Sequence, residues 1–279
     1  RRYRQGLALT VINIDGFKSI NATQGVENGD RILAEVARRV NGLLSEVDTL
    51  ARASADEFMV LQADAVSRQD VLPLVEEVLE QLSQPFLLDG NELFLTASIG
   101  IAWSDGKNES ASDLLRYASL ALRQAKQSGG NTYCWFNEAM NEKAGRSMRL
   151  RSELQRALEY GGLELYYQPI VEARTGRMTG TEALVRWHHP EEGLLQPLDF
   201  LPVAENWGLM APLTAWVLEQ ACSDNQRLID LHGDNLRVSV NISPLHFRRG
   251  DLLRSVRDVL DASGMPAECL ELELVESAF

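Results

Sequence analysis

Two glutamates and an asparagine stand near the ends of predicted strands in the second half of the chain. Glu182, Asn241 and Glu273 each lie toward the C-terminal end of an apolar segment of strand length. Carboxylate and amide oxygens are hard donors, which suit Mg²⁺ or Mn²⁺ better than zinc. Arg186 follows Glu182 closely, and its guanidinium can form a bidentate contact with phosphate oxygens. Each residue alone is more often a solvated surface group, but the combination predicts a divalent-metal site beside a phosphate-binding arginine.

The first half of the chain carries its polar residues in three short segments. Residues 13–21 read Asn-Ile-Asp-Gly-Phe-Lys-Ser-Ile-Asn, residues 29–30 read Gly-Asp, and residues 52–58 read Arg-Ala-Ser-Ala-Asp-Glu-Phe. The first segment begins within an apolar run of strand length, and the third contains a turn between two predicted strands. These segments are therefore the candidate functional loops of this half.

Composition limits the class of protein. The 279 residues include 40 acidic and 27 basic side chains, for a net charge of −13. This balance argues against a nucleic-acid or anionic-membrane binder, whose affinity comes from clustered Lys and Arg. No apolar run reaches the roughly 18–20 residues that span a bilayer. We therefore expect no nucleic-acid partner and no membrane contact by this segment.

The cysteines give no sign of a metal site or a disulfide framework. Cys134, Cys222 and Cys269 are odd in number and widely spaced. Free thiols of this kind are typical of a reducing compartment. We expect a cytoplasmic location, which includes the cytosolic part of a membrane-anchored sensor.

The elements that must position these residues change character along the chain. Residues 1–137 alternate short strands and helices, which predicts an α/β sandwich with helices packed on a mostly antiparallel sheet. Residues 138–160 form a charged amphipathic pattern, a linker helix whose apolar side is Met148, Leu150, Leu154 and Leu158. Within residues 1–137, the expected strands are 7–14, 48–52, 57–62, 93–101 and 133–136, and the expected helices are 30–44, 70–82 and 112–128.

Residues 161–279 show longer strand–helix units. Strands are expected at 163–171, 178–187, 236–242 and 270–275, with helices at 197–206, 210–231 and 246–262. Such alternation favours a parallel barrel or a doubly wound sheet. A barrel needs roughly 250 residues, whereas only 130 run from Leu150 to Phe279. We therefore expect the N-terminal half of a larger domain.

The three segments of the first half resemble the GGDEF family, the diguanylate cyclases that condense two GTP molecules into cyclic di-GMP. The resemblance implies a ferredoxin- or cyclase-like sandwich for residues 1–137. It also implies a GTP-binding role for Asn21, Asp30, Asp56 and Lys126. Asn21 and Asp30 match the pair that reads guanine, and a carboxylate suits the two adjacent N–H donors of that base. The alternative is that Asp30 caps a helix beginning at that point.

Several residues depart from the family's pattern. Ser54 and Ala55 occupy the two glycine positions that let the backbone approach a triphosphate. Asn13 stands where the family has a metal-binding carboxylate, and Gly130 where it has a basic residue. The product-inhibition motif Arg-x-x-Asp reads Ser-Glu-Val-Asp at residues 45–48. Diguanylate cyclase activity is therefore not expected.

The second half resembles the EAL family, barrel phosphodiesterases of cyclic di-GMP named for the tripeptide found here at residues 182–184. Four motifs occur in the family's order. The resemblance implies metal ligation by Glu182, Asn241 and Glu273, with Glu182 catalytic. It implies substrate contacts from Gln168, Leu184 and Arg186, and a loop-anchoring role for Glu276.

The two resemblances together predict a metal-dependent cyclic-di-GMP phosphodiesterase that forms linear pGpG, with Mg²⁺ or Mn²⁺ as cofactor and a degenerate GGDEF domain that binds GTP as a regulator. The family's paired aspartates, catalytic lysine and further glutamate do not occur within these residues, so this chain alone is expected to be inactive. The main alternative is a non-enzymatic cyclic-di-GMP receptor acting through a protein partner. A bifunctional enzyme is disfavoured by Asn13, Ser54 and Ala55. A homodimer is compatible with either domain, but the sequence contains no pattern that indicates one.

Overall fold

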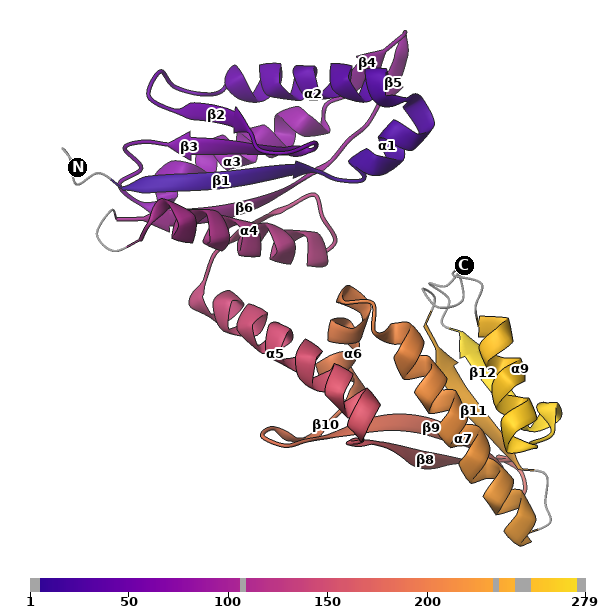
Figure 1. Ribbon diagram of the computed structural model, residues 1–279. Helices are drawn as coiled ribbons and strands as arrows, with labels where there is room; N and C mark the ends of the chain where they lie inside the picture. Colours follow the sequence, from indigo (N-terminus) through magenta and orange to yellow (C-terminus); the bar gives the residue numbers. More distant parts are fainter. Residues whose placement is uncertain (1–5, 106–108, 233–235, 244–251, 275–279) are drawn as a thin grey trace. The chain divides into compact units, whose positions relative to one another are not determined.

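The computed structural model describes residues 6–105, 109–232, 236–243 and 252–274 (Figure 1). The chain divides into two compact units, residues 1–145 and 146–279. Each unit has its own sheet and its own buried apolar side chains. Among the described helices, none is long and apolar enough to cross a membrane.

The first unit is built on a five-stranded sheet in the order β2-β3-β1-β6-β7. Its strands are β1 (Leu7–Ile14), β2 (Thr49–Arg52), β3 (Glu57–Gln62), β6 (Ala97–Ser104) and β7 (Tyr133–Trp135). Only the β6–β7 pair is parallel, and the other three pairs are antiparallel. This confirms the mostly antiparallel sandwich predicted from the sequence.

Helices cover both faces of this sheet (Figure 1). Leu9 and Val11 of β1 pack with α4 (Ala111–Gln127), whereas Ile12 and Ile14 belong to the core shared with α2 (Val26–Asn41) and α3 (Arg68–Ser83). A strand buried on both faces reads as a continuous apolar run, which explains why β1 stood out in the sequence. Gly100 of β6 lets α4 approach closely, because a Cβ there would lie 2.1 Å from the Ala118 carbonyl oxygen.

Two details of the first unit differ from the sequence prediction. The helix expected at 30–44 begins at Val26, directly after a separate helix α1 (Phe17–Gln24), and Gly25 occupies the N-cap position. Asp30 therefore lies inside α2, and the interpretation of Asp30 as a helix cap is wrong. The strand expected at 93–101 is β6, at Ala97–Ser104, and Leu93 instead ends β5 (Asn91–Leu93), which pairs with β4 (Phe86–Leu88) in a short hairpin outside the main sheet.

The second unit contains a sheet in the order β10-β9-β11-β12, with β8 paired to β9. Its strands are β8 (Leu163–Val171), β9 (Met178–His189), β10 (Gly193–Leu195), β11 (Arg237–Ile242) and β12 (Leu270–Leu274). The β9–β11 and β11–β12 pairs are parallel, and β8 and β10 are antiparallel to β9. Parallel strands joined through helices are the repeat expected of a barrel's first half.

The described helices of this unit are the greater part of α5 (Glu138–Tyr160), α6 (Pro197–Asn206), α7 (Met210–His232) and α9 (Leu252–Ser263), with a 3₁₀ turn η1 (Ala267–Cys269). Their apolar side chains pack on one face of the sheet, around buried Trp187, Val238 and Val240. Because side chains alternate along a strand, the residues between these point to the opposite face. That opposite face carries the predicted site residues.

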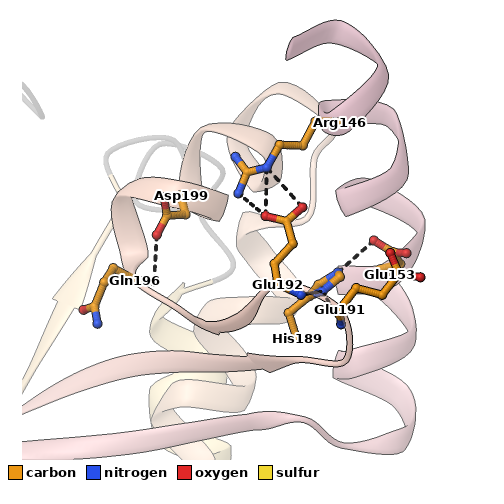
Figure 2. A network of polar contacts seen from close by, with 7 residues as sticks. All are labelled: Arg146, Glu153, His189, Glu191, Glu192, Gln196 and Asp199. Carbon is orange, nitrogen blue, oxygen red and sulfur yellow. Dashed lines mark hydrogen bonds and ion pairs between the residues drawn. The ribbon is translucent and has the colours of Figure 1, made fainter. Parts of the chain in front are cut away.

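Helix α5 has the bounds predicted from the sequence, and its C-terminal part packs in the second core. Leu150, Leu154 and Ala157 are buried there. Met148 is 66% exposed, so it does not share the packed side of Leu150 and Leu154, and its predicted place on the apolar side is wrong. Polar contacts also attach α5 to the β9–β10 hairpin (Figure 2). Arg146 forms hydrogen bonds to both carboxylate oxygens of Glu192.

Candidate functional site

Strand register places four predicted site residues on one face of neighbouring strands. Gln168 of β8 lies opposite Glu182 of β9, and Asn241 of β11 lies beside Glu273 of β12. Ser239 is the register partner of Glu182 on β11, and Asn241 follows it by two residues, on the same face. The structure therefore brings together, across β8, β9, β11 and β12, residues that are more than 100 positions apart in the sequence.

Glu182 and Asn241 are in direct contact. The Asn241 Nδ2 group donates a hydrogen bond of 2.7 Å to Glu182 Oε1. Because the amide nitrogen is directed to the carboxylate, Asn241 Oδ1 and Glu182 Oε2 remain as acceptors, and Glu273 adds a half-buried carboxylate on the next strand. This set of oxygen donors fits Mg²⁺ or Mn²⁺. No cluster of three or more His, Cys, Asp or Glu side chains occurs among the residues described.

The remaining predicted substrate contacts lie farther along the same face of β9. Leu184 and Arg186 follow Glu182 at intervals of two, and both are half-buried. The Arg186 guanidinium carbon lies 5.4 Å from the centre of the Tyr166 ring, within the range of a cation–π contact. Gln168 is exposed, and Glu276 lies outside the described residues.

The two adjacent tyrosines of β8 have different surroundings. Tyr166 is 43% exposed on the site face. Tyr167 points to the helical face, where its hydroxyl donates a 2.8 Å hydrogen bond to Asp224 of α7. Burial, together with that carboxylate, raises the pKa of Tyr167, so it stays protonated. Tyr166 is the site residue that sequence analysis missed, although its place two residues before Gln168 on a predicted strand was a usable signal.

In the first unit, a surface pocket of about 390 Å³ lies at the end of β1. Asn13, Lys126 and Gly130 line it. Two of the positions that depart from the GGDEF pattern, Asn13 and Gly130, therefore line the same pocket. Asn13 is buried, and Lys126 is exposed at the end of α4. Asn21, Asp30 and Asp56 are not among the residues that line this pocket.

Asp15 also lines the pocket, and sequence analysis gave it no role. Its carboxylate accepts hydrogen bonds from Thr96 Oγ1 (2.8 Å), Ser98 Oγ (2.7 Å) and the Asn131 backbone N–H (3.1 Å). Three donors from the protein occupy most of its acceptor capacity. The acid therefore holds β1, β6 and the turn before β7 together.

In the loop between β2 and β3, residues 53–56, the side chain of Arg52 forms hydrogen bonds to the loop backbone. Arg52 donates to the backbone carbonyls of Ser54 (3.1 Å) and Ala55 (2.9 Å), so both family glycine positions lie within an arginine-bound turn. The carbonyl of Asp56 accepts a 3.1 Å bond from the Ile14 N–H, which places Asp56 beside the end of β1.

Asn21 and Asp30 lie on the two consecutive helices α1 and α2. Asn21 Oδ1 is buried, has no hydrogen-bond partner among the described residues, and lies against the backbone of Gly29, where a Cβ would approach it to 1.9 Å. Asp30 is exposed. At the family's inhibition motif, Asp48 instead accepts bonds from the Ser45 N–H and hydroxyl, which makes a local turn.

Comparison with known families identifies both halves. Residues 1–132 match the diguanylate cyclase, GGDEF domain model, and residues 151–279 match the EAL domain model. The chain therefore belongs to the proteins that carry a GGDEF domain followed by an EAL domain.

Two curated relatives come from Pseudomonas aeruginosa. The chain is 38% identical over 270 residues to the bifunctional diguanylate cyclase/cyclic di-GMP phosphodiesterase MucR, covering 97% of this chain and 39% of MucR. It is 37% identical over 274 residues to the cyclic di-GMP phosphodiesterase NbdA, covering 98% of this chain and 35% of NbdA. The chain thus spans less than half the length of either relative.

A solved structure shares the fold over the whole chain. The S helix-GGDEF-EAL portion of Vibrio cholerae LapD, bound to c-di-GMP, matches with a TM-score of 0.60 and 17% sequence identity. The match covers 100% of this chain and 64% of that chain.

Proposed function

We propose that this chain is part of a metal-dependent phosphodiesterase that hydrolyses cyclic di-GMP to linear pGpG. The observation that carries the proposal is the contact between Glu182 and Asn241 on the open face of the second sheet, with Glu273 on the adjacent strand. The names of MucR and NbdA support the same substrate. Residues 1–137 would form the GGDEF domain, 138–160 a linker helix and 161–279 the first half of the EAL domain.

Glu182, Asn241 and Glu273 would hold Mg²⁺ or Mn²⁺. A divalent cation held there would supply positive charge against the reacting phosphodiester and activate water as the nucleophile. The hydrogen bond from Asn241 would hold the Glu182 carboxylate in one orientation. Arg186 would bind a phosphate oxygen pair, and Gln168 and Leu184 would contact the substrate beside it.

We further propose that the first domain does not synthesise cyclic di-GMP. Asn13 supplies no charge at the metal position, and the Asp15 carboxylate is occupied by three protein donors. A binding role for GTP remains part of the proposal. It would use Asn21 and Asp30 for the base and Asp56 and Lys126 near the phosphates, and the linker helix would carry the effect to the EAL domain.

The decisive experiment uses the full-length protein with cyclic di-GMP and Mg²⁺, with and without GTP, followed by chromatography of the products. We expect pGpG to form, Glu182→Ala to abolish it, and GTP to raise the rate. Asp30→Ala should remove the GTP effect; a GTP effect unchanged in this variant would overturn the regulatory proposal. Cyclic di-GMP that binds but stays intact would instead identify a receptor. Residues 1–279 alone should show no hydrolysis.

A further inference from the structure

An acid lies directly opposite the proposed phosphate-binding arginine. The register of β8 and β9 pairs Glu164 with Arg186, and directly opposed residues have Cβ atoms only about 5 Å apart. An arginine and a glutamate at this separation are natural ion-pair partners. Such a pair would occupy the guanidinium and place a negative charge where a phosphate must approach.

The structure shows a different pairing. Glu164 Oε2 lies 2.6 Å from His188 Nε2, and this pair is half exposed to solvent. Arg186 lies over the Tyr166 ring and donates a 2.9 Å bond to the carbonyl of its neighbour Val185. Within the part of the chain that the structure describes, no carboxylate forms an ion pair with Arg186.

Both contacts run along the same diagonal of the β8–β9 ladder. Glu164, opposite Arg186, reaches His188 two residues farther along β9. Tyr166, opposite Leu184, likewise reaches Arg186 two residues farther along. Diagonal neighbours in a sheet are within reach of long and aromatic side chains. The two contacts can therefore form at the same time. His188 binds the Glu164 carboxylate, which is the one directly opposite Arg186.

We propose that His188 and Tyr166 are positioning residues that keep Arg186 free and oriented for a phosphate of cyclic di-GMP. His188 withholds the Glu164 carboxylate from Arg186, and the flat Tyr166 ring supports the planar guanidinium. This inference rests on the proposed function, since it concerns the substrate contact of the same site.

The test compares three variants of the full-length protein, His188→Ala, Glu164→Gln and the double variant, by steady-state kinetics with cyclic di-GMP. In His188→Ala, Glu164 turns to Arg186, and the KM should rise about three- to fivefold with little change in kcat, because an exposed pair of this kind is worth up to about 1 kcal/mol. Glu164→Gln is the matched control and should keep the wild-type KM. The double variant should regain the wild-type KM, because no charge is left to compete. A double variant as impaired as His188→Ala would overturn the proposal.

Tyr166→Leu tests the second residue. The side chain keeps its apolar character but loses the π face, so the KM should rise about two- to fivefold. Adding Glu164→Gln should not rescue it, since the lost contact does not involve Glu164. An unchanged KM in Tyr166→Leu would exclude the role of the ring.

A spectroscopic measurement separates this inference from the proposed function. The side-chain Nε–H signal of Arg186 in the nitrogen–proton NMR spectrum, recorded without substrate, should shift in His188→Ala and return in the double variant. If wild-type protein forms no pGpG, the proposed function fails, but the NMR shift still decides whether His188 withholds Glu164 from Arg186. An Arg186 signal identical in wild type and His188→Ala would overturn the inference even in an active enzyme.

Discussion

At the scale of single residues, the geometry of hydrogen bonds decides which oxygens are available. In the second unit, the amide nitrogen of Asn241 is directed to Glu182, so its oxygen remains available as a ligand. In the first unit, three donors surround the Asp15 carboxylate, so it has little capacity left. Two polar sites at strand ends therefore differ in their capacity for a cation.

Replacing Asn241 tests the proposed metal site. Asn241→Ala removes one oxygen donor and the hydrogen bond that orients Glu182. We expect the Mg²⁺ concentration for half-maximal activity of the full-length protein to rise about 10- to 100-fold. The control is Glu271→Gln, an exposed acid two residues before Glu273, which should leave the Mg²⁺ dependence unchanged. Equal effects of both variants would argue against a specific role for Asn241.

Glu35 gives the first unit a defined acid sensitivity. Hydrogen bonds from Arg38, aided by Arg39, lower the pKa of this carboxyl from 4.5 to about 2. Its contribution to stability is therefore complete above about pH 4.5 and is lost as the pH falls toward 2. In Glu35→Gln, urea unfolding of the first unit should show a smaller loss of stability across this range. Arg38→Gln should reduce the slope as well, and a slope unchanged in both variants would refute this account.

At the scale of elements, short polar contacts fix how helices meet strands. The β9–β10 hairpin is held to α5 by two contacts of different burial (Figure 2). His189 is buried, accepts from the Glu191 and Glu192 backbone N–H groups at Nδ1 (3.2 and 3.0 Å), and lies 2.9 Å from Glu153 through Nε2. Since Nδ1 accepts, the proton is on Nε2 and is donated to Glu153.

These two contacts should contribute differently to the free energy of unfolding of the second unit. His189→Ala leaves a cavity and two backbone donors without their partner, and should lower the free energy of unfolding of the second unit by about 2–4 kcal/mol. Glu192→Gln weakens a partly exposed ion pair with Arg146 and should cost less than about 1 kcal/mol. Urea denaturation of both variants measures the difference. A larger loss in Glu192→Gln than in His189→Ala would contradict the assignment.

At the scale of the whole molecule, the larger core of the first unit and the core of the second unit share no side chains, and a third, smaller apolar cluster lies under α4 in the first unit. The first core is built around β1, α2 and α3, and the second includes the C-terminal part of α5. Helix α5 begins in the first unit and ends in the second. Substitutions in one core should therefore act on one unit.

Matched truncations test this independence. Val36→Ala in α2 and Leu154→Ala in α5 both empty fully buried positions, and should cost about 1–3 and 2–5 kcal/mol respectively. In hydrogen exchange, Val36→Ala should lower protection of β1 and β3 but not of β9 and β11. Leu154→Ala should do the reverse. Loss of protection in both units from either variant would show that they unfold as one.

Several elements were predictable because their signal is local. The bounds of β1, α5, β8 and α6 agree with the sequence prediction, since each is a long apolar or amphipathic pattern with clear ends. The start of α2 was not, because the first turn, residues 26–29, buries only Gly29 and leaves its one large apolar side chain, Val26, 67% exposed, so it shows no apolar face. Met148 was wrongly grouped with Leu150 and Leu154 on one apolar side, because residues two positions apart lie about 200° apart around a helix. Met148 is accordingly 66% exposed.

Local pattern and residue type were enough to indicate the two families, most of the strands and helices apart from α1 and β10, and the identity of the candidate ligands. Only the tertiary structure decided which side chains meet. The contact of Asn241 with Glu182, and the choice of His188 over Arg186 as the partner of Glu164, follow from strand register and from diagonal contacts across a sheet. Those depend on pairing between distant segments, which no local pattern specifies.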